Sequence, residues 1–277
     1  MEGRRGDIFD FDGHSYAGAD LLSGGVPCTP FTVSGQQLGV DDDRNLFGQA
    51  LRLTEEIRPR SVLFENVPGL STAKFDSYRG QILARLHDLG YRTWWQVIQA
   101  SDFGVPQLRP RFVLVGIKEP WAAAFRWPAA SSTPPETVGA TLHDLMAARG
   151  WTGARAWADG ANGIAPTLVG GSEKHGGADL GPSRSKAAWA VLGIDGWGVA
   201  DEPPGPDGRE YGLRRPRKDR GLGPMLTTRM CARIQGFPDE WEFAGKKTSI
   251  YEQVGNAWCP PVARAVGLAI RAALESA

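Results

Sequence analysis

A cysteine and a carboxylate each follow a short apolar run of this sequence. Cys28 lies in GGVPCTPFTVSG directly after ADLLSGG, and Glu65 and Asn66 end the run SVLFENV. If the two runs are adjacent strands of an open α/β sheet, their carboxyl ends bring a thiol and a carboxylate into one crevice. Such a pair can supply a nucleophile and a proton-transfer group. A lone cysteine is otherwise most often a small buried side chain, but a charged partner at such a place rarely serves packing.

The elements that must position this pair occupy the first part of the chain. From about Ala19 to Lys118, short apolar runs alternate with helical patterns, which predicts strand and helix units of a parallel, Rossmann-like sheet. Pro59 and Gly90 should end the two helices of this part. The expected strands are ADLLSGG, SVLFENV, TWWQVIQ and RFVLVGIK, and the expected helices cover Asn45 to Ile57 and Asp76 to Leu89.

The middle of the chain has a different character. Between about Glu119 and Arg220, Gly and Pro become dense, as in SSTPPETVG and DEPPGPDG, so regular structure should be sparse there. Order returns with LTTRMCARIQGFPDEW, and the closing PPVARAVGLAIRAALES should form a helix that packs on the sheet. These patterns predict a Rossmann-like part over residues 1–118, a separate loop-rich lobe over 119–222, and a return to the first domain over 223–277. The expected apolar stripe of the last helix is Val262, Val266, Ala269 and Ile270.

Charge and cysteine content limit the possible partners and compartments. The 31 basic and 31 acidic residues cancel, so a nucleic-acid partner requires positive charge that is concentrated locally. Cys28, Cys231 and Cys259 are far apart, which suits reduced thiols better than a disulfide framework or a metal cluster. We therefore expect a cytosolic protein without a metal. The first residues do not resemble a signal peptide, and no apolar run approaches the roughly 18 residues of a membrane span.

Five sequence blocks, in one order, resemble those of the DNA cytosine-5 methyltransferases. Each block alone is moderate evidence, but their order and spacing cover nearly the whole chain. The resemblance implies an α/β, Rossmann-like methyltransferase sheet with a smaller, loop-rich target-recognition lobe. The blocks are GGVPCTPFTVSG with Cys28, FENVPGL with Glu65, ASDFGVPQLRPRFVLVGI with Arg109 and Arg111, LTTRMCARIQGFPD, and YEQVGNAWCPPVA with Gly255 and Asn256.

The resemblance also implies a reaction. Carbon 5 of cytosine is too weakly nucleophilic to take a methyl group unaided, so a thiolate from Cys28 adds to carbon 6 and carbon 5 then attacks the methyl group of S-adenosylmethionine. Glu65 is expected to bind ring nitrogen 3 and the exocyclic amine. Arg111 is expected to stabilise negative charge at the base or the thiolate, and Arg109 to orient the site and nearby phosphate. The alternative for both arginines is a surface ion pair.

The implied partner is double-stranded DNA. The target base must be flipped out of the helix, and the loop with Ser34 and Gln36 could close on it, although the same residues suit an ordinary surface loop. The lobe occupies the place of the family's recognition segment. Its expected DNA contacts are Lys174, His175 and Arg184, together with Arg214, Arg215 and Arg217 of RRPRKDR, whose alternative is a solvated charged loop.

The resemblance is incomplete on the cofactor side. Family members hold the methionine end of S-adenosylmethionine with a glycine-rich turn upstream of the catalytic cysteine, and Met1 to Pro27 contain no such turn. We therefore expect a sheet that lacks its first strands, with an exposed edge, and half a cofactor pocket. A second polypeptide could supply the missing strands, or the reading frame could start late. The expected cofactor contacts are Asp7, Pro27, Leu46, Asn256 and Ala257.

Two other functions fit the same residues less well. A catalytically silent DNA-binding remnant has no need to keep Cys28, Glu65 and Asn256 together. An RNA cytosine-5 methyltransferase shares the cysteine and glutamate chemistry, but its recognition segment is usually more compact. One residue departs from the family pattern, because Met230 occupies a position where many members have a glutamate.

Overall fold

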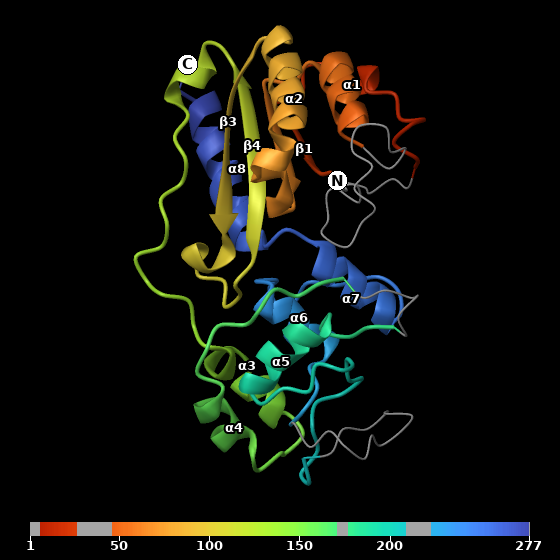
Figure 1. Ribbon diagram of the computed structural model, residues 1–277, viewed down its shortest axis with the longest axis vertical. Helices are drawn as coiled ribbons and strands as arrows, with labels where there is room; N and C mark the ends of the chain where they lie inside the picture. The colour runs from red at the N-terminus through yellow and green to blue at the C-terminus, as the bar shows by residue number, and fades with distance from the viewer. Residues whose placement is uncertain (1–5, 27–45, 171–176, 209–222, 277) are drawn as a thin grey trace. The chain divides into compact units, whose positions relative to one another are not determined.

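The computed structural model describes residues 6–26, 46–170, 177–208 and 223–276, and these residues belong to two compact units (Figure 1). The first unit combines Met1–Ile98, Pro110–Ala129 and Ala265–Ala277, and the second combines Gln99–Arg109 and Ala130–Arg264. The three predicted segments differ from these units, because residues 223–264 were expected to rejoin the sheet domain. They cluster with the second unit instead, since Leu226, Met230 and Ile234 are buried in the same core as Trp189.

A mixed four-stranded sheet forms the first unit, with the order β1 (Leu21–Gly25), β2 (Ser61–Asn66), β4 (Pro110–Lys118), β3 (Tyr91–Gln99). All the predicted strands are therefore confirmed. The expected parallel pairing holds for β1 and β2, but β4 runs antiparallel to β2. The connection 100–109 between β3 and β4 is shorter than the dozen or more residues that a parallel crossover needs, which favours a reversal of chain direction before β4.

Two predicted helices, α1 (Phe47–Ile57) and α2 (Asp76–Asp88), pack in the first unit with the sheet core. Helix α1 buries an apolar face and ends at Arg58, which has a left-handed φ of 48°, directly before Pro59. Helix α2 ends before Gly90, whose φ of 87° favours glycine. Short 3₁₀ helices complete the unit: η1 (His14–Tyr16), η4 (Pro68–Ser71), η5 (Ala73–Phe75) and η7 (Trp121–Ala124).

The last helix, α8 (Pro260–Leu274), begins at the predicted proline pair. Its buried stripe is nearly as predicted, since Val262, Val266 and Ile270 are at most 1% exposed. The residues from Ala265 onward belong to the first unit. Val266 and Ile270, on the apolar face of α8, are therefore buried in the unit that contains the sheet.

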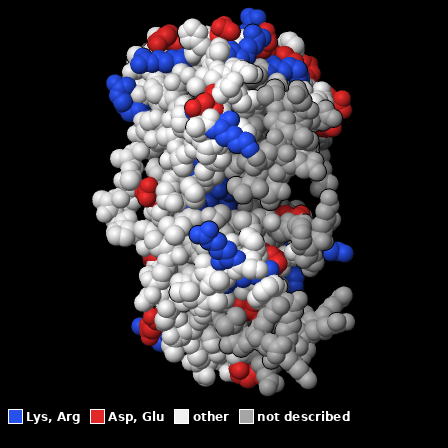
Figure 2. All heavy atoms as spheres, in the orientation of Figure 1, with Lys and Arg blue, Asp and Glu red and all other residues white. Residues whose placement is uncertain are grey.

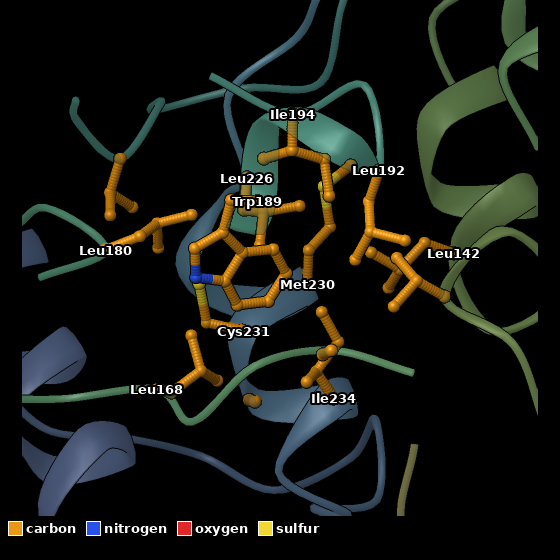
Figure 3. Packing of buried hydrophobic residues seen from close by; sticks show 14 of the residues in the cluster. Leu142, Leu168, Leu180, Trp189, Leu192, Ile194, Leu226, Met230, Cys231 and Ile234 are labelled. Atoms are coloured by element: carbon orange, nitrogen blue, oxygen red, sulfur yellow. The ribbon is translucent and has the colours of Figure 1, made fainter. Parts of the chain in front are cut away.

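Short helices build the second unit around one apolar core. They are η6 (Ala100–Phe103), α3 (Val138–Ala147), α4 (Ala154–Gly160), α5 (Ser183–Val191), α6 (Thr228–Ile234) and α7 (Lys247–Asn256). Figure 3 shows side chains from several of these elements surrounding Trp189, which is fully buried. The middle segment was predicted to have sparse regular structure, yet α3, α4 and α5 lie in it. Such short helices are marginal alone and form because tertiary packing stabilises them.

Two of the three cysteines lie among the described residues, and no disulfide joins them. Cys231 and Cys259 are both fully buried. Burial raises the pKa of the Cys231 thiol well above its usual range, because the thiolate cannot be solvated there. Cys231 is therefore a core side chain and not a nucleophile. No helix among the described residues is long and apolar enough to cross a membrane.

Met230 replaces the family's glutamate at the first turn of α6. The Thr227 hydroxyl oxygen accepts a hydrogen bond from the Met230 amide at 3.2 Å, and the Thr227 amide donates to Met230 Sδ at 3.4 Å. This is the geometry of a capping box with sulfur in place of a carboxylate. Sulfur is a weak acceptor, but the side chain is fully buried in the second core. Methionine at position 230 thus gives a weaker N-terminal cap than glutamate would, but it buries an apolar side chain in the core.

We expect Met230→Ala to lower the free energy of unfolding by about 2–5 kcal/mol, because it leaves a cavity and removes the sulfur acceptor. Urea denaturation measures this change. Val191→Ala is the matched control, since Val191 is 82% exposed and its truncation should change stability by less than about 0.5 kcal/mol. Equal stability of the two variants would show that Met230 does not hold the core.

Candidate active site

The ends of β1 and β2 are joined by hydrogen bonds from the backbone and from Asn66. The strand register places Gly25 opposite Glu65, and the Val26 amide donates to the Glu65 carbonyl at 3.2 Å. Asn66 is 2% exposed; its Nδ2 donates to the Val26 carbonyl at 3.1 Å, and its Oδ1 accepts from the Val67 amide at 2.7 Å. The backbone directly before Pro27 is therefore fixed to the end of β2. Cys28 itself lies outside the described residues, so its distance from Glu65 stays a prediction.

Glu65 forms an ion pair with Arg111 from the neighbouring strand. Arg111 Nε lies 2.8 Å from Glu65 Oε1, and the two side chains are only 13% and 12% exposed. Arg111 also donates from Nη1 to the Pro110 carbonyl at 2.8 Å. Because this pair is largely removed from water, its field is weakly screened. A carboxylate and a guanidinium held together in this way can bind a polar ring and balance charge that develops on it.

Gly25 leaves space beside this ion pair. A Cβ at position 25 would lie 3.3 Å from Glu65 Oε2, which is tighter than most contacts of real Cβ atoms. Glycine at this position therefore keeps the second carboxylate oxygen uncrowded on the β1 side. The sequence places Gly24 and Gly25 just before the predicted nucleophile segment, but only the strand register shows that Gly25 is the one opposite Glu65, while Gly24 is opposite Phe64.

Arg109 has a different place from the one predicted. It belongs to the second unit, is 1% exposed, and donates to the carbonyl oxygens of Leu168, Gly255 and Ala257. A contact with DNA phosphate does not fit this burial, so that part of the prediction is corrected. The expected orienting function does fit, because the guanidinium joins its own segment to two others that are far apart in sequence, at residue 168 and at residues 255–257.

Two buried glutamines extend the contacts of Arg109, and sequence reasoning did not single them out. Gln107 Nε2 donates to Gln235 Oε1 at 2.7 Å, and Gln107 Oε1 accepts from the Leu168 amide at 2.9 Å. Gln235 Nε2 donates in turn to the Ala257 carbonyl at 2.6 Å. Both glutamines are fully buried. Their only sequence signal is that each polar residue stands inside one of the five blocks.

The predicted cofactor residues are divided between the two units. In the first unit, Leu46 and Ile8 line a cavity of about 110 Å³ beside β1 and α1. Asp7 is exposed and lies next to this lining, and its Oδ1 accepts a hydrogen bond from the Phe9 amide at 3.0 Å. Asn256 and Ala257 lie at the end of α7 in the second unit. Pro27 lies outside the described residues.

Most of the predicted DNA contacts also lie outside the described residues: Ser34, Gln36, Lys174, His175, Arg214, Arg215 and Arg217. Arg184 is described and is exposed on α5. Lys186, two residues later, forms an ion pair with Asp179 at 2.6 Å and lies over the Trp197 ring. Figure 2 shows basic and acidic side chains interspersed on the described surface of the face in view. The segment in which the sequence concentrates positive charge, RRPRKDR, lies outside the described residues, so that expectation stays a prediction.

Comparison with known proteins identifies the family. The family model for C-5 cytosine-specific DNA methylases matches residues 2–272, and the chain belongs to that family. The chain is 54% identical over 274 residues to the type II methyltransferase M.NaeI of Lentzea aerocolonigenes, and the match covers 98% of this chain and 64% of M.NaeI. It is 44% identical over 277 residues to M.NgoMIV of Neisseria gonorrhoeae, of which it covers 83%. The chain therefore spans less than two thirds of the length of M.NaeI.

Solved structures support the fold assignment. The Dnmt2 methyltransferase of S. pombe superposes with a TM-score of 0.56 at 16% identity, over 98% of this chain and 83% of that one. The methyltransferase EhMeth of Entamoeba histolytica superposes with a TM-score of 0.58 at 14% identity, over 92% of this chain and 77% of that one. The chain therefore shares the fold of these methyltransferases.

The different surroundings of the two arginines predict different effects of substitution. Arg109→Met should lower the free energy of unfolding by about 3–5 kcal/mol, because buried carbonyl groups lose a charged donor. Arg111→Met should lower it by only about 1–2 kcal/mol, since Glu65 lies closer to solvent. Guanidinium denaturation of both variants measures the difference, and a larger loss for Arg111→Met would contradict the assignment of Arg109 to structure.

Proposed function

We propose that this chain is the catalytic and target-recognition part of a DNA (cytosine-5) methyltransferase of a type II restriction-modification system. The observation that carries the proposal is the Glu65–Arg111 ion pair beside the fixed end of β1, directly before the segment with Cys28. Membership of the C-5 cytosine-specific DNA methylase family and the likeness to M.NaeI and M.NgoMIV support it. The substrate is cytosine in double-stranded DNA.

In the proposed reaction, the Cys28 thiolate forms a bond to carbon 6 of a flipped cytosine. The electron pair of the 5,6 double bond moves to carbon 5, while Glu65 shares a proton with ring nitrogen 3 and holds the exocyclic amine. Arg111 keeps the Glu65 carboxyl group in place and balances charge on the ring side. S-adenosylmethionine supplies the methyl group. Loss of the carbon 5 proton and departure of the thiolate then restore the aromatic ring.

The described cofactor residues fit one end of S-adenosylmethionine. Besides short backbone stretches of β1, the cavity lining in the first unit is apolar and includes Ile8, Leu46, Leu53 and Phe64, which suits the faces of an adenine ring. With about 110 Å³, this cavity is smaller than the roughly 300 Å³ or more of typical small-molecule sites. It offers no charged side chain for the methionine carboxylate. We assign Asp7, Pro27 and Leu46 to the adenosine side, and Asn256 and Ala257 to the remaining contacts.

The strand β1 gives a reason to expect a further strand at this site. Among the described residues, β1 pairs with β2 alone, and Leu21 is 37% exposed. Successive side chains of a strand point to opposite faces, and cavities lie on both. One of about 300 Å³ is lined by Leu21, Ile270 and Leu274, and the smaller one by Leu22 and Leu46. The lining of the larger cavity also includes the charged residues Asp20, Arg60, Arg271 and Glu275. A strand beside β1 would satisfy its edge hydrogen bonds, and we propose that a second polypeptide supplies one.

For DNA, we propose a division between positioning and reading contacts. Arg214, Arg215 and Arg217 neutralise phosphates, which carries no sequence information. Lys174, His175 and Arg184 lie on the segment that reads the target sequence, and Ser34 and Gln36 lie on the segment that closes on the flipped base. This division follows from the composition of these segments, since charge dominates phosphate binding.

The covalent route predicts that Cys28→Ser abolishes methyl transfer and leaves DNA binding within about twofold, because a serine hydroxyl has a far higher pKa than a thiol. Incorporation of labelled methyl groups, with the strand-forming polypeptide present, measures the first effect, and a gel-shift assay the second. DNA that carries 5-fluorocytosine should trap a denaturation-resistant complex with the wild type and not with Cys28→Ser. Substantial methylation by the serine variant would remove Cys28 from its assigned role.

The proposed second polypeptide gives an independent prediction. The 277-residue chain alone should bind S-adenosylmethionine weakly and should show no turnover, because the described lining reaches only the adenosine side. Adding a polypeptide with a strand, a glycine-rich turn, a helix and a strand should restore both binding and turnover. Calorimetric titration tests this directly. Micromolar binding together with turnover by the chain alone would show that it holds the whole cofactor site.

A further inference from the structure

The side chain of Asn256 occupies space that a larger residue at position 170 would fill. A Cβ built on Gly170 would lie 2.6 Å from Asn256 Oδ1, 3.1 Å from its Cγ and 3.2 Å from its Nδ2. Gly170 is not among the residues with a positive φ, so the backbone accepts any residue there. Space, and not conformation, therefore accounts for glycine at this position.

The backbone on both sides of Asn256 is fixed as well. The Gly255 carbonyl accepts from Arg109 Nη2 at 2.6 Å, and the Ala257 carbonyl accepts from Gln235 Nε2 at 2.6 Å. Gly255 also packs closely on position 170, because a Cβ on it would lie 2.6 Å from the Gly170 amide nitrogen. Asn256 itself is exposed. The backbone of Asn256 is thus fixed by hydrogen bonds to the residues before and after it, and its exposed side chain lies close to Gly170.

Burying the amide of Gln235 and the guanidinium of Arg109 is costly unless each group is hydrogen-bonded. Arg109 and Gln235 donate hydrogen bonds to the carbonyls of Gly255 and Ala257, on either side of the exposed Asn256. An apolar core alone would not require such polar groups at this place. We propose that Gly170 and Gln235 are positioning residues that set the direction of the Asn256 amide toward the cofactor. This inference rests on the proposed function, in which Asn256 contacts S-adenosylmethionine.

Four variants test the inference in the wild-type background with the strand-forming polypeptide present. They are Gly170→Ala, Asn256→Ala, the double variant of both, and Gly160→Ala as the control, since a Cβ at position 160 meets open space. Calorimetric titration with S-adenosylhomocysteine should show about three- to tenfold weaker binding for Gly170→Ala and for Asn256→Ala. The double variant should bind no more weakly than Asn256→Ala, because both changes remove the same contact. Gly160→Ala should bind like the wild type.

Stability and amide exchange separate positioning from a general structural effect. Gly170→Ala should change Tm by less than about 3 °C, because only the end of one flexible side chain must move. In Gln235→Leu, the amides of residues 254–258 should exchange faster, while Gln235→Glu, which keeps the oxygen acceptor but loses the donor to Ala257, should show the same local change. Unchanged exchange in Gln235→Leu would overturn the role of Gln235.

The outcomes distinguish this inference from the proposed function. If Asn256→Ala leaves cofactor binding unchanged, the assigned cofactor contact is wrong and the proposed function loses that residue. If Asn256→Ala weakens binding while Gly170→Ala does not, or if the two effects add in the double variant, Asn256 is a contact but Gly170 does not position it. Absence of binding by the wild type would overturn both.

Discussion

The buried guanidinium of Arg109 is the interaction on which the second unit depends. A charge 1% exposed must be surrounded by acceptors, and here these are backbone carbonyls from residues 168, 255 and 257. These hydrogen bonds cannot form until the segment of Arg109, residue 168 and residues 255–257 have come together, so they select one arrangement of the three segments. Gln107 and Gln235 complete the set with amide groups that bind the same segments. Burying these polar groups in the second unit therefore favours one arrangement of the backbone, more than it adds to stability.

Arg109 and Arg111 lie on either side of Pro110, yet their side chains have different partners and belong to different units. Arg109 donates to backbone carbonyls of the second unit, whereas Arg111 pairs with a side chain of the first unit at the end of β2. Their separation follows from the chain itself, because the strand β4 begins at Pro110. One short motif thus contributes a structural arginine to one unit and a charged group to the candidate active site of the other.

The elements around the candidate site could be predicted from sequence because burial in a sheet leaves strong apolar runs. Each of the four predicted strands was found, and α1, α2 and α8 begin and end close to the expected residues. The direction of β4 was missed, since apolar runs do not encode strand direction. The assignment of residues 223–264 was missed because the pattern of α6 shows that it is buried but not against which partner.

Other features depend on partners that are distant in sequence. The burial of Arg109 could not be expected from an arginine in a polar motif, because its acceptors are carbonyls that any sequence possesses. Gln235 has no sequence signal beyond its place in a motif and Gly170 has none, since what distinguishes them is contact with residues 256 and 257. The ion pair of Glu65 and Arg111, by contrast, joins two residues that the motifs had already singled out. The place of Cys28 remains a prediction from those motifs.

The interleaving of the two units along the chain has a consequence for biosynthesis. The first unit is assembled from Met1–Ile98, Pro110–Ala129 and Ala265–Ala277, so its last piece is synthesised after the whole of the second unit. Until then the nascent sheet lacks α8, whose Ile270 and Leu274 line a cavity together with Leu21 of β1. Contacts between residues so far apart form slowly, and exposed strands associate with other chains in the meantime. The order of synthesis therefore separates the folding of the sheet from the arrival of the helix that packs on it.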